Sequence, residues 1–163
     1  MKKFFAILLI CTLLTACAGE TPPSETSIPL PETSAPMAET SPVYTYTLYI
    51  PNSNADGFDT KQIEAPEITP ENVLTELQKA VVLTQNVFIN AFHIEDGQLR
   101  IDFNSVFADI ICTTGTAGEY MIMGSVVNTF LGAFNAESVL ITVDGEILES
   151  GHVIYDFPIT HME

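Results

Sequence analysis

The chain has 163 residues, of which 21 are acidic and five are basic, so its formal net charge at pH 7 is −16. A surface of this sign repels phosphate backbones, which excludes nucleic acid as a partner. The three cysteines, two of them near the N-terminus, form neither a disulfide framework nor a cysteine-based metal site.

The first 16 residues have the form of a secretory signal. Lys2-Lys3 precedes an apolar run of 11 residues, Phe4 to Leu14, which is shorter than the about 20 residues of a membrane-spanning helix. The run closes on Leu14-Thr15-Ala16-Cys17, which resembles a lipobox. We therefore predict a lipoprotein signal peptide over residues 1–16 and lipidation of Cys17, with palmitate among its acyl chains. The alternative is an ordinary signal peptide in which Cys17 occurs by chance, as Cys11 does inside the apolar run.

Residues 17–42 are predicted to form a disordered tether behind the lipidated cysteine. Of the 25 residues from 18 to 42, 18 are Pro, Ser, Thr or Glu, and six of these are prolines. Prolines prevent regular helix or sheet, and the segment has almost no apolar side chains to bury. At roughly 3.1 Å per residue it reaches about 80 Å, which either lifts a domain off the membrane or serves as a spacer of no specific length.

A folded domain is predicted over residues 43–163, because some 120 residues suffice for one core but not for two domains. Residues 45–50 alternate β-branched and aromatic side chains, as strands do, and turn residues follow from Pro51 to Gly57. Thr69-Pro70-Glu71 is typical of a helix start. The helix is predicted to reach about Leu83, and the side chains expected on its buried face are Leu74, Leu77 and Val81.

The second half of the domain begins with a predicted hairpin. Strands over 87–94 and 99–103 flank Asp96-Gly97, a turn pair that tolerates positive φ. A long helix follows, which begins at residues 114–118 and ends at about Phe134. Its apolar side chains form a broad stripe along one face, and Asn128 and Thr129 are expected on the opposite face. Ser138 to Val143 is a further strand before Asp144-Gly145, and Ile147 to Ile159 adds at most a short one. The order β-α-β-β-α-β predicts an α+β fold with two helices packed on a small mixed or antiparallel sheet.

Five segments in this order resemble the GerM/GerMN domain of sporulation and spore germination proteins. Coverage is about residues 44 to 160. The segments are Tyr46-Thr47-Leu48-Tyr49-Ile50-Pro51-Asn52, the Asp96-Gly97 hairpin with Leu99-Arg100-Ile101-Asp102-Phe103, Val127-Asn128-Thr129-Phe130, Val139 to Gly145, and His152 to Pro158.

The resemblance implies a fold similar to ring-building motifs and a binding or assembly role without recognised catalytic residues. It also implies work in sporulation, germination or other cell-envelope complexes. The germination-linked member carries two tandem GerMN domains, whereas this chain has room for one. That difference leaves a direct role in sporulation open.

Other candidate sites in the sequence are weak. His93, His152 and His161 stand at no metal-ligand spacing, and no cofactor or metal site is predicted. Asp96, Asp102 and Asp109 are spread over a turn and strands, so no acid pair stands out. The 115–118 segment is read as a loop–helix junction in preference to an anion site. Residues 52–59 faintly resemble a calcium loop but lack its closing Glu, which leaves weak calcium binding open. Cys112, after Ile110-Ile111, is expected to be a buried small hydrophobe.

These observations favour a lipid-anchored, non-catalytic binding or assembly module on the extracytoplasmic face of the cell membrane. Its expected partners are the bilayer, through the Cys17 acyl anchor, and other envelope proteins or peptidoglycan, with self-association left open. The alternative is a cell-wall-acting hydrolase or ligand-modifying enzyme with an unrecognised site. That enzyme would have a deep pocket that holds acidic or histidine side chains with shifted pKa values.

Overall fold

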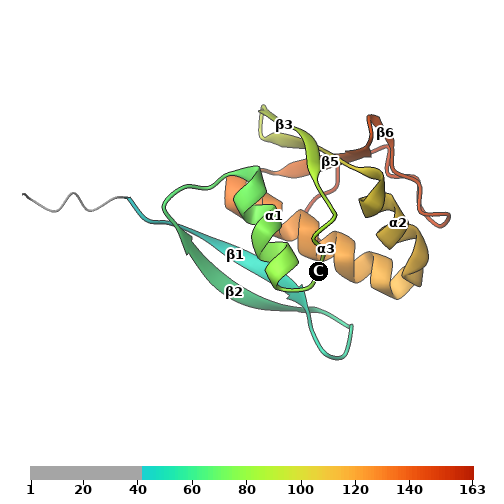
Figure 1. Cartoon of the computed structure of the whole chain (residues 1–163), viewed down its shortest axis with the longest axis horizontal. Coiled ribbons are helices and arrows are strands. Elements are labelled where there is room, and N and C mark those ends of the chain that lie inside the picture. Colours follow the sequence, from blue (N-terminus) through green and yellow to red (C-terminus); the bar gives the residue numbers. More distant parts are fainter. Residues whose placement is uncertain (1–41) are drawn as a thin grey trace, which may run out of the picture. The chain divides into compact units, whose positions relative to one another are not determined.

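The computed structural model describes residues 42–163, which contain nine helices and strands (Figure 1). The predicted signal peptide, Cys17 and the predicted tether up to residue 41 lie outside the described residues. The elements are β1 (Tyr44–Pro51), β2 (Phe58–Ala65), α1 (Pro70–Lys79), β3 (Ile89–Glu95), β4 (Gln98–Phe103), α2 (Ser105–Thr113), α3 (Gly115–Phe134), β5 (Ser138–Val143) and β6 (Glu146–Ile147).

Strands β1 and β2 form a two-stranded antiparallel sheet of their own. The predicted strand at β1 is confirmed, whereas β2 follows the predicted turn where no element was expected. The two strands pair along their whole length, from Tyr44 opposite Ala65 to Pro51 opposite Phe58. In β2 only Ile63 is fully buried, so its sequence has no apolar alternation that would indicate a strand.

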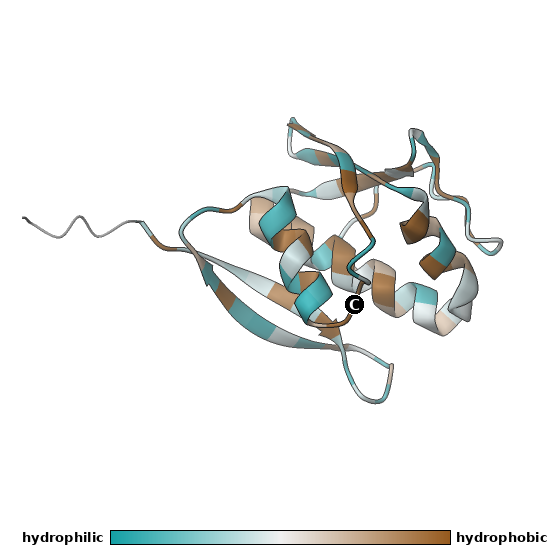
Figure 2. Cartoon of the chain, viewed as in Figure 1, coloured by the Kyte–Doolittle hydropathy of each residue, from teal (hydrophilic) through white to brown (hydrophobic). Residues whose placement is uncertain are grey.

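Helix α1 begins as predicted and ends earlier. The Thr69 hydroxyl accepts a hydrogen bond from the Asn72 N–H at 3.2 Å, and Pro70 is the first helical residue. The helix ends at Lys79 because Val81 adopts φ 61°, and the Val82 N–H donates back to the Leu77 carbonyl at 3.0 Å. The prediction that Val81 is buried was therefore wrong, since the side chain is 87% exposed. Figure 2 shows hydrophobic and hydrophilic bands along this helix.

The second sheet has the strand order β3-β4-β5-β6, with antiparallel outer pairs and a parallel β4–β5 pair. The three longer strands confirm the predicted ones. Leu99, Ile101 and Phe103 of β4 are buried while Arg100 between them is exposed, as the alternation predicted. After β6 the chain adds isolated bridges, Glu149 with Ile154 and Val139 with Ile159, in place of a regular terminal strand.

Helix α2 was not predicted, and it corrects two expectations. Phe107 and Ile111 lie four residues apart and face the core. Cys112 lies one position further round the helix, so its side chain is exposed and not buried as predicted. The Cys112 thiol donates to the Glu149 carbonyl at 3.3 Å. Asp109 lies in this helix and not in a turn or strand.

Helix α3 is the centre of the domain and lies between the β1–β2 hairpin and the four-stranded sheet (Figure 1). It is buried on most sides from Met121 to Leu131. Asn128 and Thr129 are 1% and 0% exposed, so the prediction that they face away from the core was wrong. The rings of Phe92, Phe103, Phe107, Phe130 and Phe134 pack together between α3, α2 and the sheet, with centroids 4.4–6.4 Å apart.

The α+β fold class is confirmed. Residues 42–163 contain three helices where two were predicted and two sheets where one was predicted. No helix within residues 42–163 combines the length and apolar character needed to cross a membrane.

Candidate binding site at the end of helix α3

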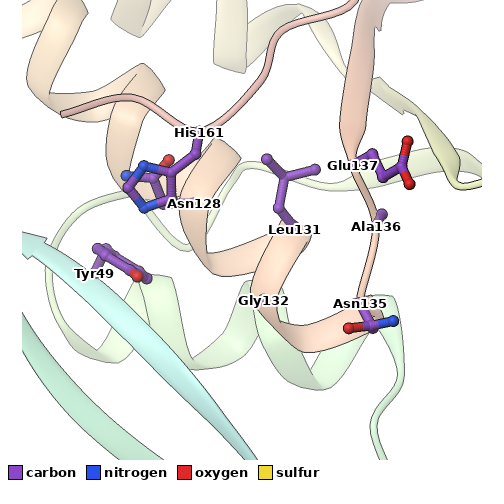
Figure 3. Close-up of a pocket in the computed structure, with 8 residues that line it drawn as sticks. All are labelled: Tyr49, Asn128, Leu131, Gly132, Asn135, Ala136, Glu137 and His161. Atoms are coloured by element: carbon purple, nitrogen blue, oxygen red, sulfur yellow. The ribbon is translucent and has the colours of Figure 1, made fainter.

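A hollow of about 450 Å³ opens beside the last turns of α3. Tyr49 and His161 lie at one end of it, and Asn135 and Glu137 lie at the other (Figure 3). Leu131 and Gly132 of α3 form the floor between them. The lining is completed by Asn128 and Ala136. Three regions far apart in the sequence, β1, α3 and the last residues of the chain, therefore meet here.

Two neighbouring buried polar residues of α3 hold the walls in place. The Asn128 amide donates to the Met162 carbonyl at 2.7 Å and accepts from the Met162 N–H at 2.8 Å. The Thr129 hydroxyl accepts from the Tyr49 N–H at 3.0 Å. Asn128 thus fixes the C-terminal segment, and Thr129 fixes β1. Both side chains are satisfied by backbone groups, which explains why polar residues occur inside this helix.

The aromatic end of the hollow is built from edge-to-face contacts. The centroids of the Tyr49 and His161 rings lie 5.6 Å apart at 76°, and those of Tyr49 and Phe58 lie 6.3 Å apart at 78°. Such near-perpendicular pairs are favourable for aromatic rings. Of the three histidines considered in the sequence, only His161 belongs to this site.

The opposite end follows from the way α3 stops. Asn135 takes the left-handed conformation at φ 49°, and its N–H and that of Ala136 both donate to the Leu131 carbonyl. The Glu137 N–H then donates to the Gly97 carbonyl at 2.8 Å, which ties the start of β5 to the β3–β4 turn. The floor is open because a Cβ placed on Gly132 would meet nothing within 4 Å.

The charge around the hollow is negative. Glu137 carries the one formal charge among the described lining residues, and α3 has no basic residue in its last turn. The C-terminal end of a helix carries about half a negative charge from its aligned peptide dipoles. Within residues 42–163 the one ion pair, between Lys79 and Glu76 at 2.7 Å, lies on α1.

The remaining histidines and aspartates lie away from this hollow. His93 of β3 lines a second hollow, of about 290 Å³, together with Arg100 and Asp102 of β4. His152 lies in the loop after Gly151. No group of three histidine, cysteine or acidic side chains within residues 42–163 is placed to hold a metal ion. Cys17, the predicted lipidation site, is outside the described residues.

The 52–57 segment and the 115–118 segment both have structural uses. The Asn52 side chain donates to Asp56 at 2.9 Å and accepts from the N–H groups of Asn54 and Asp56, so it organises the β1–β2 turn. Gly115, at φ 69°, starts α3 directly after α2. The junction predicted at this place therefore joins two helices and not a loop and a helix.

Two polar clusters that the sequence did not indicate lie away from the hollow. In the first, Asn90 donates to Asp102 at 3.1 Å and to Asp144 at 2.9 Å, so it bridges two carboxylates across β3, β4 and the β5–β6 turn. Burial by itself would raise the pKa of Asp102. Hydrogen bonds from Thr142, the Gly145 N–H and Asn90 together outweigh burial, so the pKa of Asp102 lies below its ordinary value.

The second cluster is a buried pair on the other end of α3. The Tyr155 hydroxyl donates to Glu119 Oε1 at 2.6 Å, and Glu119 is 2% exposed. Burial, followed by the hydrogen bond to Glu119 and the charge of Glu119, raises the pKa of Tyr155. This contact fastens the loop after β6 to the first turns of α3.

Comparison with known proteins gives one family. Residues 47–149, more than half of the chain, match the family described as Germane: sporulation and spore germination. No curated protein sequence matches the chain.

Two solved structures are similar to the chain. The tandem GerMN domains of the sporulation protein GerM from Bacillus subtilis align with 17% identity and a TM-score of 0.49, over 80% of this chain and 50% of that one. A protein from Clostridium perfringens, described as a candidate lipoprotein, aligns with 16% identity and a TM-score of 0.43, over 72% and 87%. The chain thus spans half the length of the tandem GerM structure.

Proposed function

Because the chain belongs to the Germane family of sporulation and spore germination proteins, we propose that it is a lipid-anchored binding or assembly module outside the cytoplasm. The family match confirms the GerMN resemblance seen in the sequence. In the proposal, Cys17 carries the lipid, residues 18–42 are the tether, and the domain contacts a partner in a sporulation, germination or other envelope complex.

The observation that carries this proposal is the position of the family domain behind a lipobox. The matched region begins at residue 47, and Leu14-Thr15-Ala16-Cys17 with the proline-rich segment precedes it. A single acyl chain holds a protein only marginally at a membrane, whereas two hold it stably. The acidic domain is repelled by anionic headgroups, so the proposal makes the lipid the source of membrane affinity.

We propose a non-catalytic role because the acid and the histidine of the hollow at the end of α3 do not converge on one point. The acidic and histidine members of the hollow, Glu137 and His161, lie at opposite ends of it (Figure 3). Asp102 and Asp144 are joined by Asn90 in a cluster that links strands. A binding module needs a shaped surface but no converging acidic and histidine side chains. The hollow at the end of α3 is such a surface.

Metabolic labelling with palmitate tests the anchor. The chain is expressed in a bacterium that processes lipoproteins, as wild type, Cys17→Ala and Cys11→Ala. Label and membrane association are expected for the wild type and for Cys11→Ala, and both are expected to be lost for Cys17→Ala. Equal labelling of Cys17→Ala, or recovery of the wild type in the cytosol, would overturn the anchor.

Crosslinking in intact cells tests the binding role. A photoreactive residue placed at Gly132 is expected to capture a discrete partner, whereas one placed at Glu67, an exposed residue on the β2–α1 connection, is not. Turnover of wall fragments by the purified chain would contradict the non-catalytic role.

A further inference from the structure

We propose that the hollow at the end of α3 binds a lysine or arginine side chain of a partner protein. This inference rests on the proposed binding role and names the chemistry of the partner. The net charge of the domain, the local charge at the hollow and the shape of the hollow support it.

The net charge of the domain favours a cationic partner. Residues 42–163 contain 17 acidic and three basic residues, a net charge of −14. Of the basic residues, Lys79 is paired with Glu76, Lys61 lies on β2, and Arg100 lies on β4. None of them lines the hollow. A field of this sign draws cationic groups toward the domain and repels anions.

The charge at the Glu137 end of the hollow also favours a cation. The Glu137 carboxylate stands at one end of the hollow, next to the C-terminal end of α3, where the helix dipole favours a cation. In many helices a basic side chain of the last turn fills this role, and α3 has none. The place is thus open to a cation from another molecule.

The shape of the hollow suits a long side chain. Leu131 offers an apolar floor, and Gly132 leaves room above the helix for a chain of methylene groups. Lysine and arginine carry such an apolar stem below a charged tip. A neutral sugar would use the Tyr49 ring and the amides but would gain nothing from the negative field.

Binding is measured by NMR on the purified chain in detergent, with whatever N-terminal processing the host gives it. The chain is titrated with Nα-acetyl-lysine amide and Nα-acetyl-arginine amide. Saturable shifts are expected at the amides of Gly132 and Glu137. Nα,Nε-diacetyl-lysine amide has the same stem without the charge and is expected to give no saturable shift.

Three variants separate this site from general attraction to an acidic protein. Gly132→Leu fills the hollow and is expected to weaken binding at least about tenfold, while its melting temperature shows that it folds. Glu137→Gln is expected to weaken binding about fivefold, the upper range for an exposed ion pair. Glu67→Gln removes the same charge elsewhere and is expected to change binding less than about twofold.

The proposal is overturned if Gly132→Leu binds as well as the wild type, or if Glu67→Gln and Glu137→Gln weaken binding equally. It is also overturned if neither the lysine amide nor the arginine amide gives a saturable shift, or if the diacetylated lysine amide binds as well as they do. Because these measurements use the purified chain, they fail or succeed independently of the palmitate labelling.

Discussion

The ring of Phe58 lies directly against the backbone of Gly124, so that strand β2 and helix α3 touch where the helix has no side chain. A Cβ on Gly124 would stand 3.0 Å from Phe58 Cε1 and closer still to Cζ. This contact explains why a glycine occurs in the middle of a buried helix, where glycine normally costs about 1 kcal/mol of stability relative to alanine.

The two interior glycines of α3 should therefore respond in opposite directions to alanine. We expect Gly124→Ala to lower the free energy of unfolding by about 1–2 kcal/mol, because the Phe58 ring must move. We expect Gly132→Ala to raise it by about 0.5–1 kcal/mol, because the added methyl meets nothing. Urea unfolding checks both. Adding Phe58→Leu to Gly124→Ala should recover part of the loss.

Val81 holds a backbone conformation that β-branched residues rarely adopt, and its side chain is 87% exposed. Val81→Gly should therefore stabilise the chain by about 1 kcal/mol, since glycine adopts positive φ without strain. Val82→Ala, next in the chain but at a buried position, should destabilise it. Thermal unfolding of the two variants tests whether the end of α1 is formed as described.

Two buried tyrosines should give opposite results when each loses its hydroxyl. The Tyr46 hydroxyl makes no hydrogen bond with any described residue, so Tyr46→Phe should be neutral or stabilising at pH 7. Tyr155→Phe removes the donor to Glu119 and should cost about 2–3 kcal/mol, because a buried carboxylate loses its partner. Equal effects in urea unfolding would contradict this account.

The raised pKa of Tyr46 predicts a loss of stability in alkali. Burial, with a smaller contribution from Glu76, raises the pKa of Tyr46 to about 12. In the unfolded chain a tyrosine loses its proton near pH 10, so the folded state binds more protons between pH 10 and about 12. Stability should therefore fall as the pH rises through this window. Unfolding midpoints at pH 8 and pH 11 should differ less in Tyr46→Phe than in the wild type.

The lowered pKa of Asp102 predicts a loss of stability in acid. Its pKa is lowered in the folded chain, so its contribution is present above the unfolded value near 3.9 and is lost as the pH falls below it. Asp102→Asn should destabilise the chain at pH 7, since the acceptor of the Asn90 amide is replaced by a donor. The stability of this variant should also depend less on pH between 5 and 3. Urea midpoints across that range provide the measurement.

Asn128 should be the most sensitive polar residue of the hollow. Asn128→Ala breaks both hydrogen bonds to Met162 and should lower the free energy of unfolding by about 2–3 kcal/mol. Asn135→Gly serves as the control, because that residue is exposed at φ 49° and glycine suits the conformation. A small effect of Asn128→Ala would show that the C-terminal segment is held by other contacts.

Most of the secondary structure follows from local patterns. The strand at β1, the start of α1, the β3–β4 hairpin, α3 and β5 each have an apolar period or a turn pair that local chemistry produces. Strand β2 has none, because Ile63 is its one buried residue and five of the other seven residues are exposed. Helix α2 is short, and only Phe107 and Ile111 are buried in it. Both elements are stabilised by what they pack against.

Sequence alone determined the sign of the charge, the α+β class, the family resemblance and the lipobox that leads to the proposed anchor, because each depends on neighbouring residues or on a simple count. Only the tertiary structure decided that Asn128 and Thr129 are buried and that Tyr49, Gly132, Glu137 and His161 surround one hollow. These residues are up to 112 positions apart in the chain. Their proximity arises because α3 is covered by β1 on one side and by the C-terminal segment on another, which no local pattern can encode.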